Sequence, residues 1–154
     1  MIGIEKEKTC AVTGHRTVLS DLSKKNLKQE ILKVINKGVD TFLVGMAVGF
    51  DTICFNVLEE IRKEIPIKII ACIPCPNQDK NFSLSQKREY ERMNDVSDRR
   101  LLISKSYTSG CMLKRNRFMV DNSDYLICYL RQNRGGTFYT VTYAKEKNKN
   151  IIKI

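Results

Sequence analysis

Two kinds of apolar pattern alternate along the chain. The first is a short run of consecutive apolar residues. Such a run, without a polar residue at every second position, is typical of a strand buried on both faces of a parallel sheet. The last run lies at the carboxyl end of the sequence and is expected at an edge of the sheet. Strands are therefore predicted at residues 9–13, 41–44, 67–73, 101–104, 125–130 and 151–154.

The second pattern is the helical spacing of apolar residues between these runs. After the first run, the pair at residues 20–21, Ser-Asp, is suited to cap a helix, and Gly38 is suited to end it. Between them Leu27, Ile31 and Val34 form an apolar face. Further helices are predicted from a cap at Asp51 to a stop at Pro66, and over residues 84–94, 110–122 and 137–147.

The segment 137–147 is ambiguous on local grounds. Thr137, Thr140, Val141 and Thr142 favour a strand by propensity. Two parallel strands, however, need a crossover connection between them, and this segment alone can supply one before the last strand. We therefore predict a helix.

Strands and helices thus alternate along the whole chain, a pattern that predicts the α/β class. We expect a single Rossmann-like three-layer domain over residues 1–154, with a mainly parallel sheet, helices on both faces and right-handed crossovers. In such a sheet, ligands bind beyond the carboxyl ends of the strands, where the strand order reverses. The loops that follow the strands are therefore the place to look for chemistry.

Composition narrows the class of protein. With 42% hydrophobic and 29% charged residues in 154, the chain has the balance of one globular domain. The amino terminus lacks the apolar stretch that is typical of a signal peptide. No run approaches the roughly 20 apolar residues that span a bilayer. We expect a soluble, cytoplasmic protein that does not bind membranes.

The net charge of +10 has two interpretations. It is typical of proteins that bind a polyanion such as nucleic acid, but also of a lysine-rich solvated surface. The lysines do not form one block, and no recognisable nucleic-acid motif accompanies them. We favour the solvated surface, and a smaller anionic ligand is compatible with either interpretation.

Six cysteines raise the question of metal or redox chemistry. Cys72 and Cys75 match the C-x-x-C pattern, but a zinc site needs further ligands and His15 is the only histidine. A redox pair is expected at the start of a helix, whereas Cys72 is predicted to end a strand. We expect neither a metal site nor redox chemistry here.

Three loops at predicted strand ends carry glycines and polar groups suited to a phosphate. Residues 13–16 read Thr-Gly-His-Arg, residues 45–51 read Gly-Met-Ala-Val-Gly-Phe-Asp, and residues 134–137 read Arg-Gly-Gly-Thr. Glycine lets the backbone approach a ligand, and a helix start presents free N–H groups and partial positive charge. Asp51 has two interpretations, as a helix cap or as a partner for a ribose hydroxyl. Three such loops at one sheet edge predict an anion site.

Two further segments have weaker claims to the same site. Arg115 and Asn116 lie within a predicted helix, so only part of the Lys-Arg-Asn triplet can face a pocket, and a solvated basic face is the alternative. Gln78 follows a proline-rich turn after the third strand, and its role is equally open.

Taken in order, these motifs resemble the YpsA-like proteins of the SLOG superfamily, which is named for DprA/Smf and the LOG phosphoribohydrolases. The resemblance extends from about Thr9 to Ile154 and implies one SLOG-type domain with a pocket for nucleotides or nucleotide-derived molecules. The loops and the resemblance together assign to this pocket Gly14, His15, Arg16, Gly45, Ala47, Gly49, Asp51, Gln78, Arg115, Asn116, Gly135, Gly136 and Thr137.

The sequence departs from the enzymatic LOG relatives at one motif. Those relatives carry a Pro-Gly-Gly-x-Gly-Thr loop followed by a glutamate that serves hydrolysis of an N-glycosidic bond. Here the proline and one glycine are missing, and no carboxylate occurs between Asp124 and Glu146. Without that group there is no obvious general base for water. We therefore assign no catalytic residue.

Three functional hypotheses follow. We favour a sensor or sequestering module for a nucleotide or an ADP-ribose-like ligand, which needs no other cofactor and no metal. The second is a nucleotide N-glycosidase, or phosphoribohydrolase, with Asp51 as its carboxylate. The third is nucleic-acid binding, as in the DNA-processing relatives. A homodimer is a further hypothesis, drawn from related Rossmann-like proteins.

Overall fold

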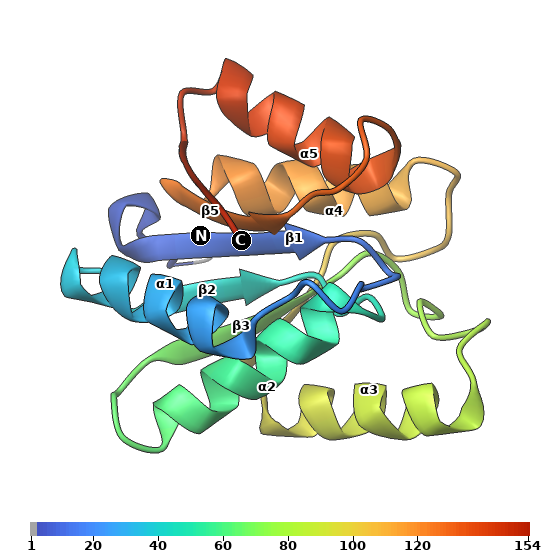
Figure 1. Cartoon of the computed structure of the whole chain (residues 1–154). Coiled ribbons are helices and arrows are strands. Elements are labelled where there is room, and N and C mark those ends of the chain that lie inside the picture. Colours follow the sequence, from blue (N-terminus) through green and yellow to red (C-terminus); the bar gives the residue numbers. More distant parts are fainter. Residues whose placement is uncertain (1–2) are drawn as a thin grey trace.

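All strands of the protein run parallel in one sheet (Figure 1). The computed structural model describes residues 3–154. Its strands are β1 (Thr9–Gly14), β2 (Thr41–Val44), β3 (Lys68–Ile73), β4 (Arg99–Leu102), β5 (Tyr125–Tyr129) and β6 (Asn150–Lys153), in the order β4-β3-β2-β1-β5-β6. The predicted Rossmann-like α/β class with a parallel sheet is confirmed.

Helices cover both faces of this sheet. The helices are α1 (Lys24–Asn36), α2 (Phe50–Arg62), α3 (Leu84–Val96), α4 (Cys111–Asp121) and α5 (Gly135–Glu146), after a short 3-10 turn at Lys6–Lys8. Figure 1 shows α4 and α5 above the sheet and α1, α2 and α3 below it. Leu27, Leu58 and Met93 share one buried cluster, while Met119 and Val141 belong to the other. The three-layer arrangement therefore has two apolar cores, one on each face of the sheet.

The strand order reverses beside β1. The chain proceeds outward from β1 through β2 and β3 to β4, and then returns to place β5 on the other side of β1. Thr13 of β1 lies opposite Cys128 of β5, and Gly14 opposite Tyr129, so both strands end together. In open parallel sheets this is the point at which a crevice forms for a ligand.

The ambiguous segment is helical, as predicted, and forms α5, which starts two residues before the predicted start and ends at Glu146. β6 pairs only with β5 and so forms an edge, also as predicted. β4, in contrast, begins two residues before the predicted start, because Arg99 and Arg100 pair with β3 at the other edge. Their side chains are exposed there, so no apolar pattern marks them as part of a strand.

The predicted cap of α1 at residues 20–21 is wrong. Ser23 caps the helix instead, since its side-chain oxygen accepts the Asn26 N–H at 3.1 Å. Asp21 is held elsewhere, where its carboxylate accepts hydrogen bonds from the Tyr129 hydroxyl at 2.9 Å and from Arg131 Nε at 2.6 Å. A contact across more than a hundred residues thus decides which of two suitable residues begins the helix.

The cysteines all carry free thiols and all are buried. Within residues 3–154, no group of three or more His, Cys, Asp or Glu side chains is arranged to hold a metal ion. Over the same residues, none of the helices combines the length and the apolar character needed to cross a lipid bilayer.

Candidate functional site

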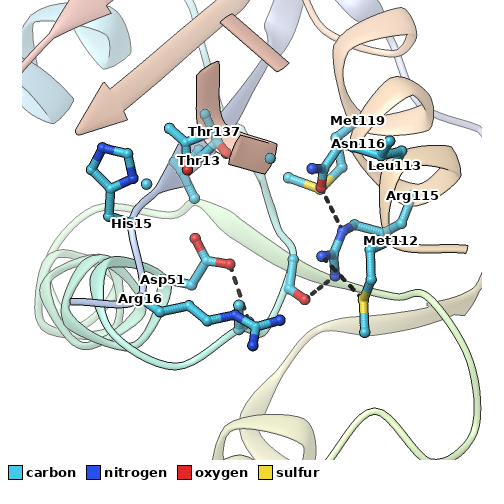
Figure 2. Close-up of a pocket in the computed structure, with 15 residues that line it drawn as sticks. Thr13, His15, Arg16, Asp51, Met112, Leu113, Arg115, Asn116, Met119 and Thr137 are labelled. Atoms are coloured by element: carbon cyan, nitrogen blue, oxygen red, sulfur yellow. Dashed lines mark hydrogen bonds between the residues drawn. The ribbon is translucent and has the colours of Figure 1, made fainter. Parts of the chain in front are cut away.

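A cavity of about 320 Å³ lies at the carboxyl ends of β1 and β2, where the strand order reverses (Figure 2). Its wall is formed by the loop after β1, the start of α2, one side of α4 and the start of α5. Ten of the predicted residues line it: Gly14, His15, Arg16, Gly45, Ala47, Asp51, Arg115, Asn116, Gly136 and Thr137. Gly49, Gln78 and Gly135 are not part of this wall. The structure therefore brings most of the predicted residues, but not all, to one place.

Some lining residues were not predicted. Thr13 ends the apolar run of β1, and Met112, Leu113 and Met119 come from α4. Thr13 belongs to the first loop motif of the sequence but was not assigned to the pocket. The α4 residues carry no such signal, because their apolar side chains equally suit a core.

The loop between β2 and α2 depends on Gly49. Its φ is +85°, and a Cβ placed on it would lie 2.1 Å from the backbone oxygen of Arg16. Only glycine allows both this conformation and this approach. Gly49 therefore holds the loop after β2 against the loop after β1, although it does not line the cavity.

Asp51 does not cap α2 as predicted, because Gly49 occupies that position and makes no side-chain cap. The Asp51 carboxylate instead accepts the Ala47 N–H through Oδ2 at 3.1 Å and so closes the loop on itself. Its other oxygen, Oδ1, is buried and has no hydrogen-bond partner in the part of the chain that the structure describes. Such an oxygen can accept a hydrogen bond from a ligand.

The environment of Asp51 also changes its acidity. The side chain is 5% exposed, and this burial raises the pKa of Asp51 from 3.8 to about 6, although Arg115, the Ala47 N–H and Arg16 each oppose the rise. The carboxylate is thus partly protonated near neutral pH. Figure 2 shows Asp51 beside Arg16 on one side of the cavity, with Arg115 across from them.

Arg115 is buried and holds two strand ends together. Its guanidinium donates hydrogen bonds to the carbonyl oxygens of Gly45 and, at 3.3 Å, Cys72, while Nε donates to Asn116 Oδ1 at 2.8 Å. A Cβ on Gly45 would lie 3.0 Å from this guanidinium, so the glycine leaves the space that Arg115 crosses. Burial lowers the pKa of Arg115, and the nearby Asp51 carboxylate acts against that change. Most of the hydrogen-bond donors of Arg115 are therefore already used within the protein.

Gln78 has a similar supporting role. Its Nε2 donates to the Gly45 carbonyl oxygen at 2.9 Å, and its Oε1 accepts a hydrogen bond from the Tyr90 hydroxyl at 3.0 Å. Gln78 is buried and lies behind the loop after β2 rather than in the wall of the cavity. It positions that loop.

Arg16 differs from Arg115 in having no hydrogen-bonded partner among the described residues. It is exposed at the cavity, and across residues 3–154 its guanidinium makes no hydrogen bond or ion pair. A guanidinium in this state can bind a phosphate through two parallel hydrogen bonds. Arg16 is the free positive group of the site.

The start of α5 supplies backbone donors. Gly136 and Thr137 line the cavity, and Arg134, which precedes the helix, makes no side-chain cap. The first N–H groups of a helix have no partner within the helix, and its dipole favours an anion there. The helix start and Arg16 therefore face the same space.

His15 joins the two strand ends at the crevice. Its Nε2 accepts the Arg131 N–H at 2.7 Å and the Gln132 N–H at 3.3 Å, so the loop after β1 is tied to the loop after β5. Partial burial and the charge of Arg131 lower the pKa of His15. The histidine therefore acts in its neutral form, as an acceptor for backbone groups.

Comparison with known proteins gives a consistent result. The family model YpsA, described as the YspA SLOG family, matches residues 10–154. The SPbeta prophage-derived protein YoqJ of Bacillus subtilis is 28% identical over 138 residues, which cover 78% of this chain and 81% of that protein. A UPF0398 protein of Listeria monocytogenes is 24% identical over 161 residues, covering 94% of this chain and 89% of the relative.

Among solved structures, the chain is similar to DNA processing protein A. The Streptococcus pneumoniae protein superposes with a TM-score of 0.67 at 16% identity, and the match covers 96% of this chain and 50% of that one. The Helicobacter pylori protein, described for its mode of binding single-stranded DNA, has a TM-score of 0.67 at 18% identity and is covered over 65% of its length. This chain thus corresponds to one part of each of those proteins, and the likeness is one of fold.

Proposed function

This chain belongs to the YpsA family of SLOG proteins, and from that premise we propose that it binds a nucleotide or a nucleotide-derived ligand resembling ADP-ribose. In this proposal it is a sensor or sequestering module, the phosphate lies over the start of α5, and the ribose lies against Asp51. The proposal needs no other cofactor and no metal.

One observation carries this proposal: the unsatisfied groups of the cavity complement a sugar phosphate. The uncapped start of α5 and Arg16, which makes no hydrogen bond or ion pair within residues 3–154, are donors for a phosphate. Asp51 Oδ1 is an acceptor for a hydroxyl, and it is buried without a partner among the described residues. A hydroxyl that donates to Asp51 satisfies an oxygen that is otherwise costly to bury.

A second candidate function, cleavage of an N-glycosidic bond, is supported by the same carboxylate. Asp51 is the one carboxylate among the residues that line the cavity, and a pKa of about 6 leaves it mostly ionised at neutral pH. Such a group suits a general base. We place it second, because the loop at α5 lacks the carboxylate of the enzymatic relatives.

Binding of single-stranded DNA is a third candidate. It is supported by the net charge of +10 and by the similarity of fold to DNA processing protein A. Such binding depends on phosphate contacts along an extended surface, whereas the unsatisfied groups described above converge on a single cavity. A homodimer and a cytoplasmic location stay predictions.

The test is calorimetric titration of the protein with ribose 5-phosphate, adenosine 5′-monophosphate and ADP-ribose, after native mass spectrometry of freshly purified material. We expect saturable binding of at least one compound, with one site per chain. Chromatography of the same mixtures detects free base, and its release in catalytic amounts would establish the glycosidase instead. Absence of binding by all three, together with tight and salt-sensitive binding of single-stranded DNA, would contradict the proposal in favour of the third candidate.

A further inference from the structure

A second cavity, of about 340 Å³, adjoins the first at the carboxyl end of the sheet. It lies between the loop after β3, with Asn77, Gln78 and Asn81, and the loop before α4, with Tyr107. A small hollow of about 20 Å³ shares Arg16 and Arg115 with the first cavity and Gln78 with the second. Met112 lines all three spaces. The two cavities are therefore neighbours along one rim.

The second cavity has a different chemistry from the first. Tyr107 is 64% exposed, and within residues 3–154 its ring contacts no other aromatic ring and its hydroxyl makes no hydrogen bond. The side-chain amides of Asn77 and Asn81 are also without partners in that range. The wall thus combines a free aromatic face, a thioether from Met112 and two free amides. Cys75 and Lys80 also line this cavity, and Lys80 is the one charged residue in its wall.

These groups are the ones that recognise a nucleobase. Aromatic side chains stack on bases, and an asparagine amide offers a donor and an acceptor side by side, which match the amino and ring nitrogens of adenine. We propose that this second cavity holds the base of a purine nucleotide, with Tyr107 stacked on its face and Asn77 and Asn81 at its edge. This inference rests on the proposed function, since the phosphate and ribose of the same ligand occupy the first cavity.

Another cavity of about 320 Å³, between α2 and α3, is a less suitable site for a base. Most polar side-chain atoms in its wall already have hydrogen-bond partners. Gln86 Oε1 accepts the Ser83 N–H at 2.9 Å, and the Glu89 carboxylate accepts a hydrogen bond from Arg92 at 2.6 Å. The remaining wall is mostly apolar, with Phe82 and Ile53 among its members. Apart from the Gln86 amide nitrogen, its wall offers few groups that would select one base over another.

The experiment compares adenosine 5′-monophosphate with ribose 5-phosphate, which lacks the base, on wild type and on Tyr107 variants. Tyr107→Ala should weaken binding of the nucleotide by about 10-fold or more, and leave the affinity for ribose 5-phosphate unchanged. Tyr107→Phe is the matched control and should bind the nucleotide like wild type, because the stacking face remains. Replacing both Asn77 and Asn81 by Ala should reduce the preference for the adenine nucleotide over the uracil nucleotide.

The outcomes separate this inference from the proposed function. If ribose 5-phosphate binds and Tyr107→Ala affects neither compound, or both equally, the base site is overturned and the phosphate site stands. If Phe82→Ala, in a variant that still folds, discriminates between the two compounds and Tyr107→Ala does not, the base lies between α2 and α3 and the inference is again wrong. If wild type binds neither compound, both proposals fail.

Discussion

The starts of α3 and α5 lie at the same rim of the sheet but differ in how their backbone groups are satisfied. At α3, Ser83 Oγ accepts the Gln86 N–H at 3.2 Å and Gln86 Oε1 accepts the Ser83 N–H in return, which forms a complete capping box. At α5, Arg134 makes no such bond, and Gly136 lies open to the cavity. The first N–H groups of α3 are therefore capped within the protein, whereas those of α5 are available to a ligand.

The contrast extends to all five helices. The two with a serine cap, α1 and α3, contribute no residue to the first cavity. The three without a side-chain cap, α2, α4 and α5, all contribute residues to it. A side-chain cap is worth about 1 kcal/mol to a helix, so the uncapped starts forgo stability where the cavity lies. This is the distribution expected if the open starts serve a ligand.

A side chain placed at the uncapped start of α5 should have the largest effect on ligand binding. Gly136→Val places a branched side chain in the space where the phosphate is proposed to lie, and we expect binding of sugar phosphates to be lost. The fold should tolerate the change, because the nearest atom to an added Cβ is Asn116 Nδ2 at 4.0 Å. The measurements are calorimetry for binding and circular dichroism for folding.

Gly110→Val is the matched control, since Gly110 precedes α4, has open space around it and does not line the cavity. It should leave binding intact. Normal affinity in Gly136→Val would remove α5 from the phosphate site.

The next largest effect is expected on the stability of the protein, through the Asp51 carboxylate that accepts the Ala47 N–H in the loop before α2. The pKa of Asp51 is raised from 3.8 to about 6, so its contribution to stability is fully present below pH 4 and is lost as the pH rises through 6. The rise corresponds to about 3 kcal/mol. Asp51→Asn cannot ionise and can still accept the Ala47 N–H, so it avoids this loss. Its stability relative to wild type should therefore increase from pH 4.5 to pH 8. We also expect it to bind ribose compounds less tightly.

Urea unfolding of wild type and Asp51→Asn at pH 4.5 and pH 8 measures the difference in their free energies of unfolding. Asp95→Asn, at an exposed position on α3, is the matched control for the change of charge. A constant difference between Asp51→Asn and wild type across the range would show that the carboxylate is not held in a desolvated state.

A smaller loss of binding is expected at Arg16. Arg16→Ala should weaken binding of ribose 5-phosphate by about 10- to 100-fold, which corresponds to a charge-assisted hydrogen bond of about 1.5–3 kcal/mol. Its thermal unfolding should stay close to that of wild type, because the guanidinium makes no hydrogen bond or ion pair with the described residues. Arg88→Ala, on the exposed side of α3, is the control and should change neither quantity. Equal losses in the two variants would mean that net charge, rather than the site, controls binding.

The sequence carried enough information for the order of strands and helices, and for most of the cavity wall. Periodicity marked the buried faces, and the need for a crossover identified α5 against the propensity of its threonines. Glycines after strands marked the loops, because the carboxyl ends of parallel strands meet at one edge. These are local or topological signals that need no knowledge of side-chain packing.

The roles of individual polar residues were harder to predict, because distant contacts decide them. Arg115 and Gln78 were both expected at a ligand, yet both donate to the carbonyl oxygen of Gly45. Asp51 was expected to cap a helix and instead binds the Ala47 N–H within the preceding loop. In each case the residue type fitted either role, and only the three-dimensional arrangement shows which carbonyl or amide lies within reach.

The smallest predicted effect tests the comparison of helix starts directly. Arg134 has extended backbone angles, φ −161° and ψ 163°, which suit a serine cap. Arg134→Ser should therefore stabilise the protein by about 0.5 kcal/mol relative to Arg134→Ala, which removes the same charge without adding a cap. The new hydroxyl competes with phosphate for the same N–H groups, so its affinity for ribose 5-phosphate should be about two- to threefold lower than that of the alanine variant. A serine that stabilises the helix without weakening binding would show that the donors at the start of α5 are not those that hold the ligand.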